Sequence, residues 1–129
     1  MKYNLNSKKV FNTELLSQLT KAKNIIDEDV SRKIDISELA REVALSKFYF
    51  FRCFKNAFGF SPYQYLLKKR LERSMELLTE GDYLVTDVAY QVGFNDIYSF
   101  SKSFKKHFNA CPSQVSVTAA VIFNFVLFC

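Results

Sequence analysis

The chain is poor in the two residues that most often interrupt regular structure. It has three glycines and two prolines among 129 residues. Sandwiches and barrels need many turns, and turns depend on Gly and Pro, so this scarcity argues against them and favours helices with short connections. Trp is absent whereas Phe occurs 14 times, which predicts a core rich in phenylalanine. The length allows one or two small cores.

Residues for metal or thiol chemistry are also few. His107 is the single histidine, and the three cysteines, Cys53, Cys111 and Cys129, lie far apart. No pair has the short spacing of a zinc site, so free thiols in a reducing cytoplasm are expected. No Gly-rich phosphate loop is present, and nothing positive indicates a nucleophile system. We therefore expect no metal, no cofactor and no enzymatic activity.

The two ends of the chain differ in character. Residues 1–12 are polar, lack the apolar stretch of a signal peptide, and are expected to form a flexible arm. No charged residue occurs from Gln114 onward, and residues 121–128 are strongly apolar. This stretch is shorter than the roughly 20 residues that a membrane-spanning helix needs. Residues 115–129 are therefore interpreted as an atypical apolar tail, and no membrane partner is expected.

One helix is delimited at both ends by its sequence. Ser61 can accept hydrogen bonds as an N-cap, Pro62 suits the first helical position, and Gly81 can adopt the left-handed conformation that ends a helix. The residues between them supply apolar and basic side chains: Tyr65, Leu66, Lys68, Lys69, Arg70, Arg73, Met75, Leu77 and Leu78. A helix over residues 61–80 is expected, and the 19 residues from Ser61 to Thr79 span roughly 28 Å at 1.5 Å per residue.

Three helical patterns precede this helix. The first begins near Thr13, a candidate N-cap, and has apolar residues at helical spacing up to about Asp29: Leu16, Leu19, Ala22, Ile25 and Ile26. The second follows a cap at Asp35 or Ser37, with an inward face of Leu39, Ala40 and Val43. The third follows Ser46 and ends at Gly59, with an inward row of Phe50, Phe54 and Phe58. The short turn between the second and third predicts a helix-turn-helix.

The same pattern recurs after the central helix. Residues 36–40 correspond to residues 85–89, and one additional residue, Asn95, then raises the offset from 49 to 50. Residue roles match in the pairs Ser46/Asp96, Phe50/Phe100, Arg52/Lys102, Phe54/Phe104, Phe58/Phe108, Gly59/Asn109 and Pro62/Pro112. Gly93 lies at the second turn, where a positive φ is often needed. An internal duplication is therefore expected, with helix-turn-helix motifs at about residues 35–58 and 84–108.

The second helix of each repeat is the candidate recognition helix. Its outward face mixes cations with uncharged side chains, which suits a DNA groove better than plain solvation. These residues are Lys47, Phe48, Phe51, Arg52 and Lys55 in the first repeat, and Ile97, Tyr98, Ser101, Lys102, Lys105 and Lys106 in the second. The formal charge of +5 favours an anionic partner only weakly, because in many basic proteins the positive charge serves only to keep the protein soluble.

The outward residues allow more than one interpretation. Arg52 could contact guanine or hold a phosphate, while Phe48 and Phe51 could contact thymine methyl groups or sugars. Alternatively, either phenylalanine could belong to the core, and the lysines at 55, 105 and 106 could form a solvated face. Adjacent major-groove segments lie about 34 Å apart, so the central helix could set two recognition helices one DNA turn apart and allow monomeric binding.

The combined motifs resemble the DNA-binding domain of AraC/XylS-type transcriptional regulators. They run from about residue 16 to residue 114 and comprise Ile36-x-x-Leu39-Ala40, Ser46-x-x-x-Phe50-x-Arg52-x-Phe54-Lys55, Phe58-Gly59-x-Ser61-Pro62-x-x-Tyr65-Leu66, Arg70-Leu71, Leu77-Leu78, Val88-Ala89, Gly93-Phe94-x-Asp96, Phe100-Ser101-Lys102-x-Phe104-Lys105 and Pro112. The resemblance implies an all-α domain over residues 13–114, with about seven helices. Two homeodomain-like helix-turn-helix subdomains would be joined by the linker helix 61–80.

The resemblance also implies a function. It implies binding to double-stranded promoter DNA at the nucleoid in the cytoplasm, usually to activate transcription, with RNA polymerase as a further candidate partner. By position it assigns DNA contacts to Lys47, Phe48, Phe51 and Arg52 in the first recognition helix, and to Ile97, Tyr98, Ser101 and Lys102 in the second. The chain carries no separate effector domain, so a stand-alone regulator and a fragment of a longer one both fit.

The chain departs from the family pattern at three places. Tyr98-Ser99 stands where members often have Ser-Tyr, Cys111 replaces the usual Ser cap, and Val115-Ser116 replaces Tyr-Arg. The alternative function is a protein-interaction module or decayed regulator that kept the fold and lost DNA binding. The altered C-terminal segment and Phe51 favour that alternative.

Overall fold

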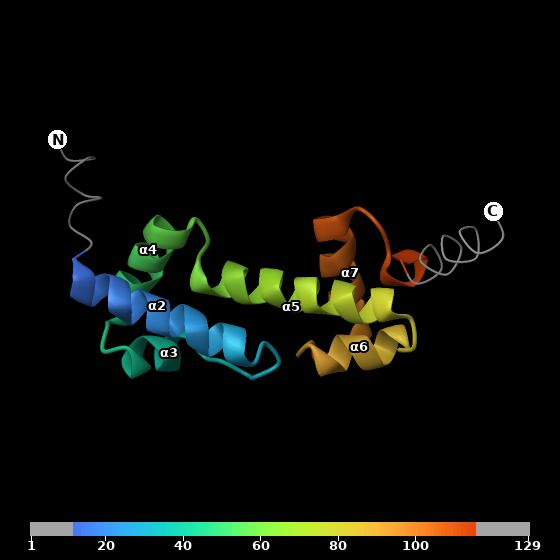
Figure 1. The fold of residues 1–129 in the computed structure, drawn as a ribbon, viewed down its shortest axis with the longest axis horizontal. Helices are drawn as coiled ribbons and strands as arrows, with labels where there is room; N and C mark the ends of the chain where they lie inside the picture. Colours follow the sequence, from blue (N-terminus) through green and yellow to red (C-terminus); the bar gives the residue numbers. More distant parts are fainter. Residues whose placement is uncertain (1–11, 116–129) are drawn as a thin grey trace. The chain divides into compact units, whose positions relative to one another are not determined.

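The computed structural model describes residues 12–115, and their regular secondary structure is entirely helical. Six helices have both ends in this range: α2 Thr13–Glu28, α3 Ile36–Glu42, α4 Lys47–Phe58, α5 Pro62–Glu80, α6 Val85–Gln91 and α7 Ile97–Phe108 (Figure 1). Residues 112–115 begin a further helical segment. The predicted all-α fold is confirmed. The predicted arm and apolar tail lie outside the described residues, except for Asn12 and Val115.

The chain divides into two compact units, each with an apolar core of its own. The first unit contains α2, α3, α4 and the start of α5 as far as Leu66. The second contains α5 from Leu67 onward, α6 and α7, together with residues 30–32. The repeated sequence pattern therefore corresponds to two separately packed helical units.

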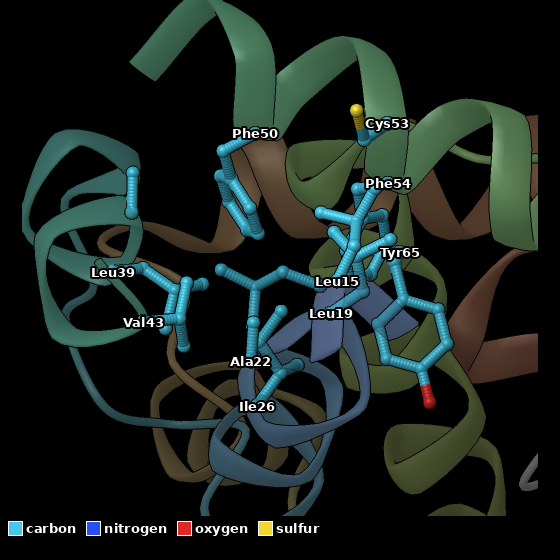
Figure 2. Close-up of a cluster of buried hydrophobic side chains, with 12 residues drawn as sticks. Leu15, Leu19, Ala22, Ile26, Leu39, Val43, Phe50, Cys53, Phe54 and Tyr65 are labelled. Atoms are coloured by element: carbon cyan, nitrogen blue, oxygen red, sulfur yellow. The ribbon is translucent and has the colours of Figure 1, made fainter. Parts of the chain in front are cut away.

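The core of the first unit is built from one face of each of its helices (Figure 2). Phe50 and Phe54 are fully buried, and the Phe54 ring packs edge-on against the rings of Phe50, Phe58 and Tyr65 at centroid distances of 5.6, 4.7 and 5.9 Å. Edge-on aromatic packing adds to the free energy gained by burying apolar area. Twelve residues form this core: Leu15, Leu19, Ala22, Ile26, Leu39, Ala40, Val43, Phe50, Cys53, Phe54, Tyr65 and Leu66.

The buried face of α2 differs by one position from the predicted one. Leu15 is buried, whereas Leu16, predicted to face inward, is 45% exposed. The predicted N-cap, Thr13, is also wrong, because the side chain of Asn12 accepts a hydrogen bond from the Leu15 backbone N–H at 2.7 Å. Adjacent leucines both fit a helical period, so spacing alone did not show which one faces the core.

The other predicted helix ends are present. Ser46 Oγ accepts a hydrogen bond from the Tyr49 N–H at 3.4 Å, and Asp96 Oδ1 accepts one from the Ser99 N–H at 2.7 Å. Gly59 and Asn109 end α4 and α7 with φ values of 84° and 59°. Of the two candidate caps for α3, Asp35 is the one used. These ends formed as predicted because capping depends on residues that are close in sequence.

The second unit repeats the first with α5 in the place of α2. Leu19, Ala22 and Ile26 of α2 correspond, 52 residues later, to the buried residues Leu71, Ser74 and Leu78 of α5. Ser74 Oγ donates a hydrogen bond to the Leu71 carbonyl at 2.6 Å, so its burial leaves no polar atom unpaired. The predicted linker helix therefore also serves as the first helix of the second unit.

The second core is completed by α6, α7 and their flanks. Its buried residues are Leu71, Leu77, Leu78, Val88, Ala89, Val92, Phe100 and Phe104. Val115 packs against it and is half-buried, so the first residue of the predicted tail contributes to the second unit. A truncation that spares the second core must therefore start after Val115.

Candidate nucleic-acid interface

The outward face of α4 is accessible along its length. Lys47, Phe48, Phe51, Arg52 and Lys55 are all exposed, as the helical spacing places them opposite the buried Phe50 and Phe54. Phe48 is 82% exposed and Phe51 is 42% exposed. The alternative that either phenylalanine belongs to the core is therefore wrong. The first unit presents two phenylalanines and three cations on one continuous stripe.

The outward face of α7 is similar but less uniform. Tyr98 is 84% exposed, and Lys102, Lys105 and Lys106 are exposed, while Ser101 is half-buried. Ile97 differs from the prediction, because it is half-buried and packs against the second core. Burying an isoleucine side chain gains about 1.5–3 kcal/mol, which explains why the first residue of α7 turns inward where its counterpart in α4, Lys47, stays exposed.

Tyr49 is a residue of the α4 surface that the sequence reasoning missed. The Arg52 guanidinium carbon lies 6.0 Å from the centre of the Tyr49 ring, which is within cation–π range. A hydrogen bond with the Cys53 side chain raises the pKa of Tyr49. The spacing of three residues between Tyr49 and Arg52 was the available signal. This contact limits the directions that the Arg52 side chain can take.

The cations near the end of α7 have a role inside the protein. Lys105 and Lys106 occupy the last turn of α7, and Lys55 occupies the last turn of α4. Positive side chains there interact favourably with the negative end of the helix dipole, by about 0.3–1 kcal/mol each at exposed sites. The helix dipole alone therefore explains the positive charge at Lys55, Lys105 and Lys106, and a DNA partner is not needed to explain it. Both interpretations of these lysines, a solvated face and phosphate contact, fit the structure.

The connection before each recognition helix differs in length and in backbone. Residues 43–46 join α3 to α4, and residues 92–96 join α6 to α7, so the additional residue Asn95 falls in the second turn. Both turns contain a residue with positive φ, Ala44 at 61° and Gly93 at 105°. Asp96 caps the start of α7 by accepting hydrogen bonds from the Ser99 backbone N–H and hydroxyl group. The same bonds hold the pKa of the Asp96 carboxyl below its usual range.

The part of the chain that the structure describes holds neither a metal-binding cluster nor a membrane-spanning helix. Within residues 12–115, no three His, Cys, Asp or Glu side chains gather where they could hold a metal ion. None of the helices in that range combines the length and the apolar character needed to cross a membrane.

Comparisons with known proteins agree with this arrangement. Residues 39–116 match the family of helix-turn-helix domains. The lactose operon transcription activator of Staphylococcus xylosus is 31% identical over 93 residues, which cover 72% of this chain and 33% of that protein. This chain spans about a third of the length of several of the curated relatives that it matches.

Two solved structures have the same fold. A transcriptional regulator from Chromobacterium violaceum, described as containing an AraC-type DNA-binding domain, aligns with a TM-score of 0.74 at 26% identity, over 84% of this chain and 97% of its own. The DNA-binding domain of AdpA, a global transcriptional factor solved in complex with a target DNA, aligns with a TM-score of 0.75 at 25% identity, over 78% and 91% of the two chains. The family match includes both α4 and α7 and covers more than half of the sequence, so the chain belongs to the AraC/XylS-type family of helix-turn-helix transcriptional regulators and carries that family's DNA-binding domain.

Proposed function

We propose that this chain is a sequence-specific transcriptional regulator that inserts α4 and α7 into adjacent major-groove segments of double-stranded promoter DNA. The observation that carries the proposal is the matched exposure of Phe48 and Tyr98, at 82% and 84%, in equivalent positions of the two repeats. Leaving a large aromatic side chain in water forgoes about 1.5–3 kcal/mol of burial. A partner that covers the same position in both units explains why the two repeats share this feature.

The cations beside these aromatic residues favour a nucleic acid. Each aromatic residue is followed four positions later by a cation on the same helical face, in the pairs Phe48/Arg52 and Tyr98/Lys102. Lysine and arginine contact phosphates and fix the position of a protein on DNA, whereas an arginine that reaches guanine, or an apolar side chain on a thymine methyl, supplies specificity. Arg52, Phe48 and Phe51 are therefore assigned to base recognition in α4.

The second recognition surface has fewer groups for base recognition. We assign Tyr98, Ser101 and Lys102 to bases or sugars, and exposed Lys105 and Lys106 to phosphates. Half-buried Ile97 is left with little surface for DNA. Because α4 presents an arginine and two phenylalanines, we propose that the first unit contributes more of the sequence preference than the second.

Two units in one chain support binding as a monomer. A single chain supplies two recognition helices, so a non-palindromic site can be occupied without a dimer. The Staphylococcus xylosus relative is named an activator, which supports activation as the mode of regulation. Activation, the polymerase contact and the monomeric state are parts of the proposal.

Selection from a random pool of DNA duplexes tests the proposal, followed by affinity measurements over a salt series. The expected result is an enriched site with two sequence blocks about one helical turn apart. The logarithm of affinity should fall with the logarithm of salt concentration with a slope of several units, because phosphate contacts release counterions. Absence of enrichment together with a flat salt response would reject the proposal.

A protein-interaction module is the second candidate function. The exposed rings of Phe48, Phe51 and Tyr98 would also suit an apolar groove on another protein. The variant Phe48→Ala in the duplex assay separates the two candidates. If DNA is the partner, this change weakens the selected site. If the chain is a protein-interaction module, any residual duplex binding is non-specific and Phe48→Ala leaves the duplex affinity unchanged.

A further inference from the structure

The ring of Tyr49 lies beside the Arg52 side chain on the recognition helix of the first unit. The Arg52 guanidinium carbon is 6.0 Å from the centre of that ring, and the two residues are three positions apart along α4. A cation at this distance is attracted by the electron-rich face of an aromatic ring. Tyr49 therefore gives Arg52 a contact surface within α4 itself, before any partner is bound.

The Tyr49 side chain is itself restrained by the protein. It forms a hydrogen bond with the side chain of Cys53, which is 6% exposed and belongs to the first core. The exposed fraction of Tyr49 is 39%, about half that of Phe48 at 82%. A side chain that is hydrogen-bonded and partly covered has already lost part of its rotamer freedom on folding. Tyr49 can therefore support the flexible arginine beside it.

No acidic side chain competes with Tyr49 for the Arg52 guanidinium in the described part of the chain. The sequence of α4 contains neither aspartate nor glutamate, and none of the ion pairs formed between described residues involves Arg52. The five N–H donors of a guanidinium lie in its plane, whereas a cation–π contact uses the face of the ring. The contact with Tyr49 can therefore orient Arg52 while its donors stay available for a base.

The second unit lacks this arrangement at the equivalent positions. Its counterparts of Tyr49, Arg52 and Cys53 are Ser99, Lys102 and Ser103. The Ser99 hydroxyl group donates a hydrogen bond to Asp96 Oδ2 at 3.1 Å, so it serves the start of α7. Between residues 12 and 115, no aromatic ring makes a cation–π contact with Lys102. Of the two recognition helices, the one that carries the arginine is thus the one with an aromatic support.

Such a support matters for base recognition because arginine is a long and flexible side chain. Immobilising a side chain of this kind on binding costs free energy. A bidentate contact to guanine also requires the guanidinium to meet two acceptors on the base edge in one fixed geometry. An arginine whose directions are already limited by Tyr49 loses less freedom when it makes this contact. The benefit should appear as a stronger preference for the base pair that Arg52 contacts.

We propose that Tyr49 is a positioning residue that orients Arg52 toward the base edge, and that it thereby contributes to the sequence preference of the first unit. The proposal rests on the proposed DNA-binding function. Tyr49 acts through Arg52 and needs no contact of its own with DNA. Replacing Tyr49 should therefore reduce discrimination at the base pair contacted by Arg52 and leave the preferences at the other positions of the site unchanged.

The test compares Tyr49→Leu and Tyr49→Phe with the unchanged chain and with Tyr63→Leu, each checked for folding by thermal unfolding. Leucine removes the aromatic face and favours a helix, whereas phenylalanine keeps the face. Tyr63→Leu makes the same change at a tyrosine of α5 that is 64% exposed. Affinity is measured for the selected duplex and for its single-base variants, with Arg52 present and in an Arg52→Ala background.

Tyr49→Leu should reduce the preference at the base pair contacted by Arg52 by about two- to fivefold. Tyr49→Phe should keep most of this preference, and Tyr63→Leu should keep all of it. In the Arg52→Ala background, Tyr49→Leu should have no further effect on the preference. An equal loss of affinity for all duplexes would overturn the proposal, as would equal losses in Tyr49→Phe and Tyr49→Leu. A site in which no base pair depends on Arg52 would overturn it as well.

A second measurement does not depend on DNA. In the free protein, the ¹⁵N order parameter of the Arg52 Nε–H bond should fall in Tyr49→Leu, because the side chain then moves more freely. The same quantity for Arg41, which is exposed on α3, should stay constant. An unchanged order parameter of Arg52 in Tyr49→Leu would refute the positioning. If it falls as expected but no duplex is enriched, Tyr49 does orient Arg52 and the DNA-binding proposal fails, so the two failures can be told apart.

Discussion

The hydroxyl group of Tyr65 donates a hydrogen bond to Asp27 Oδ1 at 2.6 Å, and this bond joins the start of α5 to α2 inside the first unit. The Tyr65 ring is 7% exposed and packs against Phe54, so the residue is held by both apolar and polar contacts. The first turn of α5 is thereby fixed to the first core.

Tyr65→Phe should lower the free energy of unfolding by about 1–2 kcal/mol, because it removes a hydrogen bond to a charged acceptor and keeps the ring. Urea unfolding followed by circular dichroism measures the change. Tyr63→Phe is the matched control, since Tyr63 is 64% exposed and two residues away. A control variant that loses as much stability would mean that the Asp27 bond is not the cause.

Gly93→Ala and Ala44→Gly are expected to differ in their effect on stability, because only the first should be destabilising. Gly93→Ala should destabilise the protein by about 2 kcal/mol or more, since it adds left-handed backbone strain and a steric conflict with Arg70. Ala44→Gly should be neutral or stabilising by up to about 1 kcal/mol, because Ala44 already has a φ of 61°. Thermal unfolding at equal protein concentration compares them. Equal effects of the two changes would show that close approach at Gly93 is unimportant.

Cys111→Ser should stabilise the protein by about 0.5–1 kcal/mol through a capping hydrogen bond. At the start of α5, Ser61 N–H donates to Gln64 Oε1 at 2.9 Å and Gln64 N–H donates to Ser61 Oγ at 3.1 Å. At Cys111 the first of these bonds recurs, from Cys111 N–H to Gln114 Oε1 at 2.8 Å, while the Gln114 N–H is directed to the Cys111 carbonyl.

The reciprocal change, Ser61→Cys, is the control for Cys111→Ser, and it should lower stability by a similar amount. Both variants are measured by urea unfolding under reducing conditions. If Cys111→Ser has no effect while Ser61→Cys is destabilising, the segment after Pro112 does not depend on its cap.

Because of Asp96, the stability of α7 should depend on pH and fall in acid. Because hydrogen bonds from Ser99 lower the pKa of this carboxyl in the folded protein, the carboxylate stabilises the fold above the usual aspartate pKa of about 4. This contribution is lost as the pH falls through the lower folded-state value. The melting temperature of the unchanged chain should exceed that of Asp96→Asn at pH 7, and the difference should shrink below about pH 4.

Ser46 provides the converse test, because it caps α4 at the equivalent position and does not titrate. Ser46→Asp should introduce into α4 the same loss of stability in acid. A difference between Asp96→Asn and the unchanged chain that stays constant from pH 7 to pH 3 would contradict the role given to the carboxylate.

Arg52→Ala should reduce affinity for the selected duplex by about 1–3 kcal/mol and relax the preference at one position of the first block. Arg73→Ala, at an exposed arginine of α5, is the control. If Arg52→Ala weakens all sequences equally, Arg52 holds a phosphate instead of contacting a base. Fluorescence anisotropy against a panel of single-base variants distinguishes the two results.

Local chemistry explains how much of the fold could be predicted. Ser46, Gly59, Asp96 and Asn109 are at helix ends, as predicted, because a cap and the turn that it closes lie within four residues. The buried rows of Phe50 with Phe54 and of Phe100 with Phe104 follow from the helical period. The buried row of α4 also predicted which residues of α4 are exposed, because Phe48 and Arg52 lie on the opposite side of that helix.

The sequence by itself determined the duplication, the helix ends and the outward position of Phe48 and Arg52, because capping and periodicity act over a few neighbouring residues. Only the tertiary structure decided that Leu15 is buried instead of Leu16, that Ile97 turns toward the second core, and that Arg70 holds residues 30–32. In each of these cases a side chain had more than one allowed environment. Packing against elements distant in sequence, 38 and 40 residues away for the partners of Arg70, selected one.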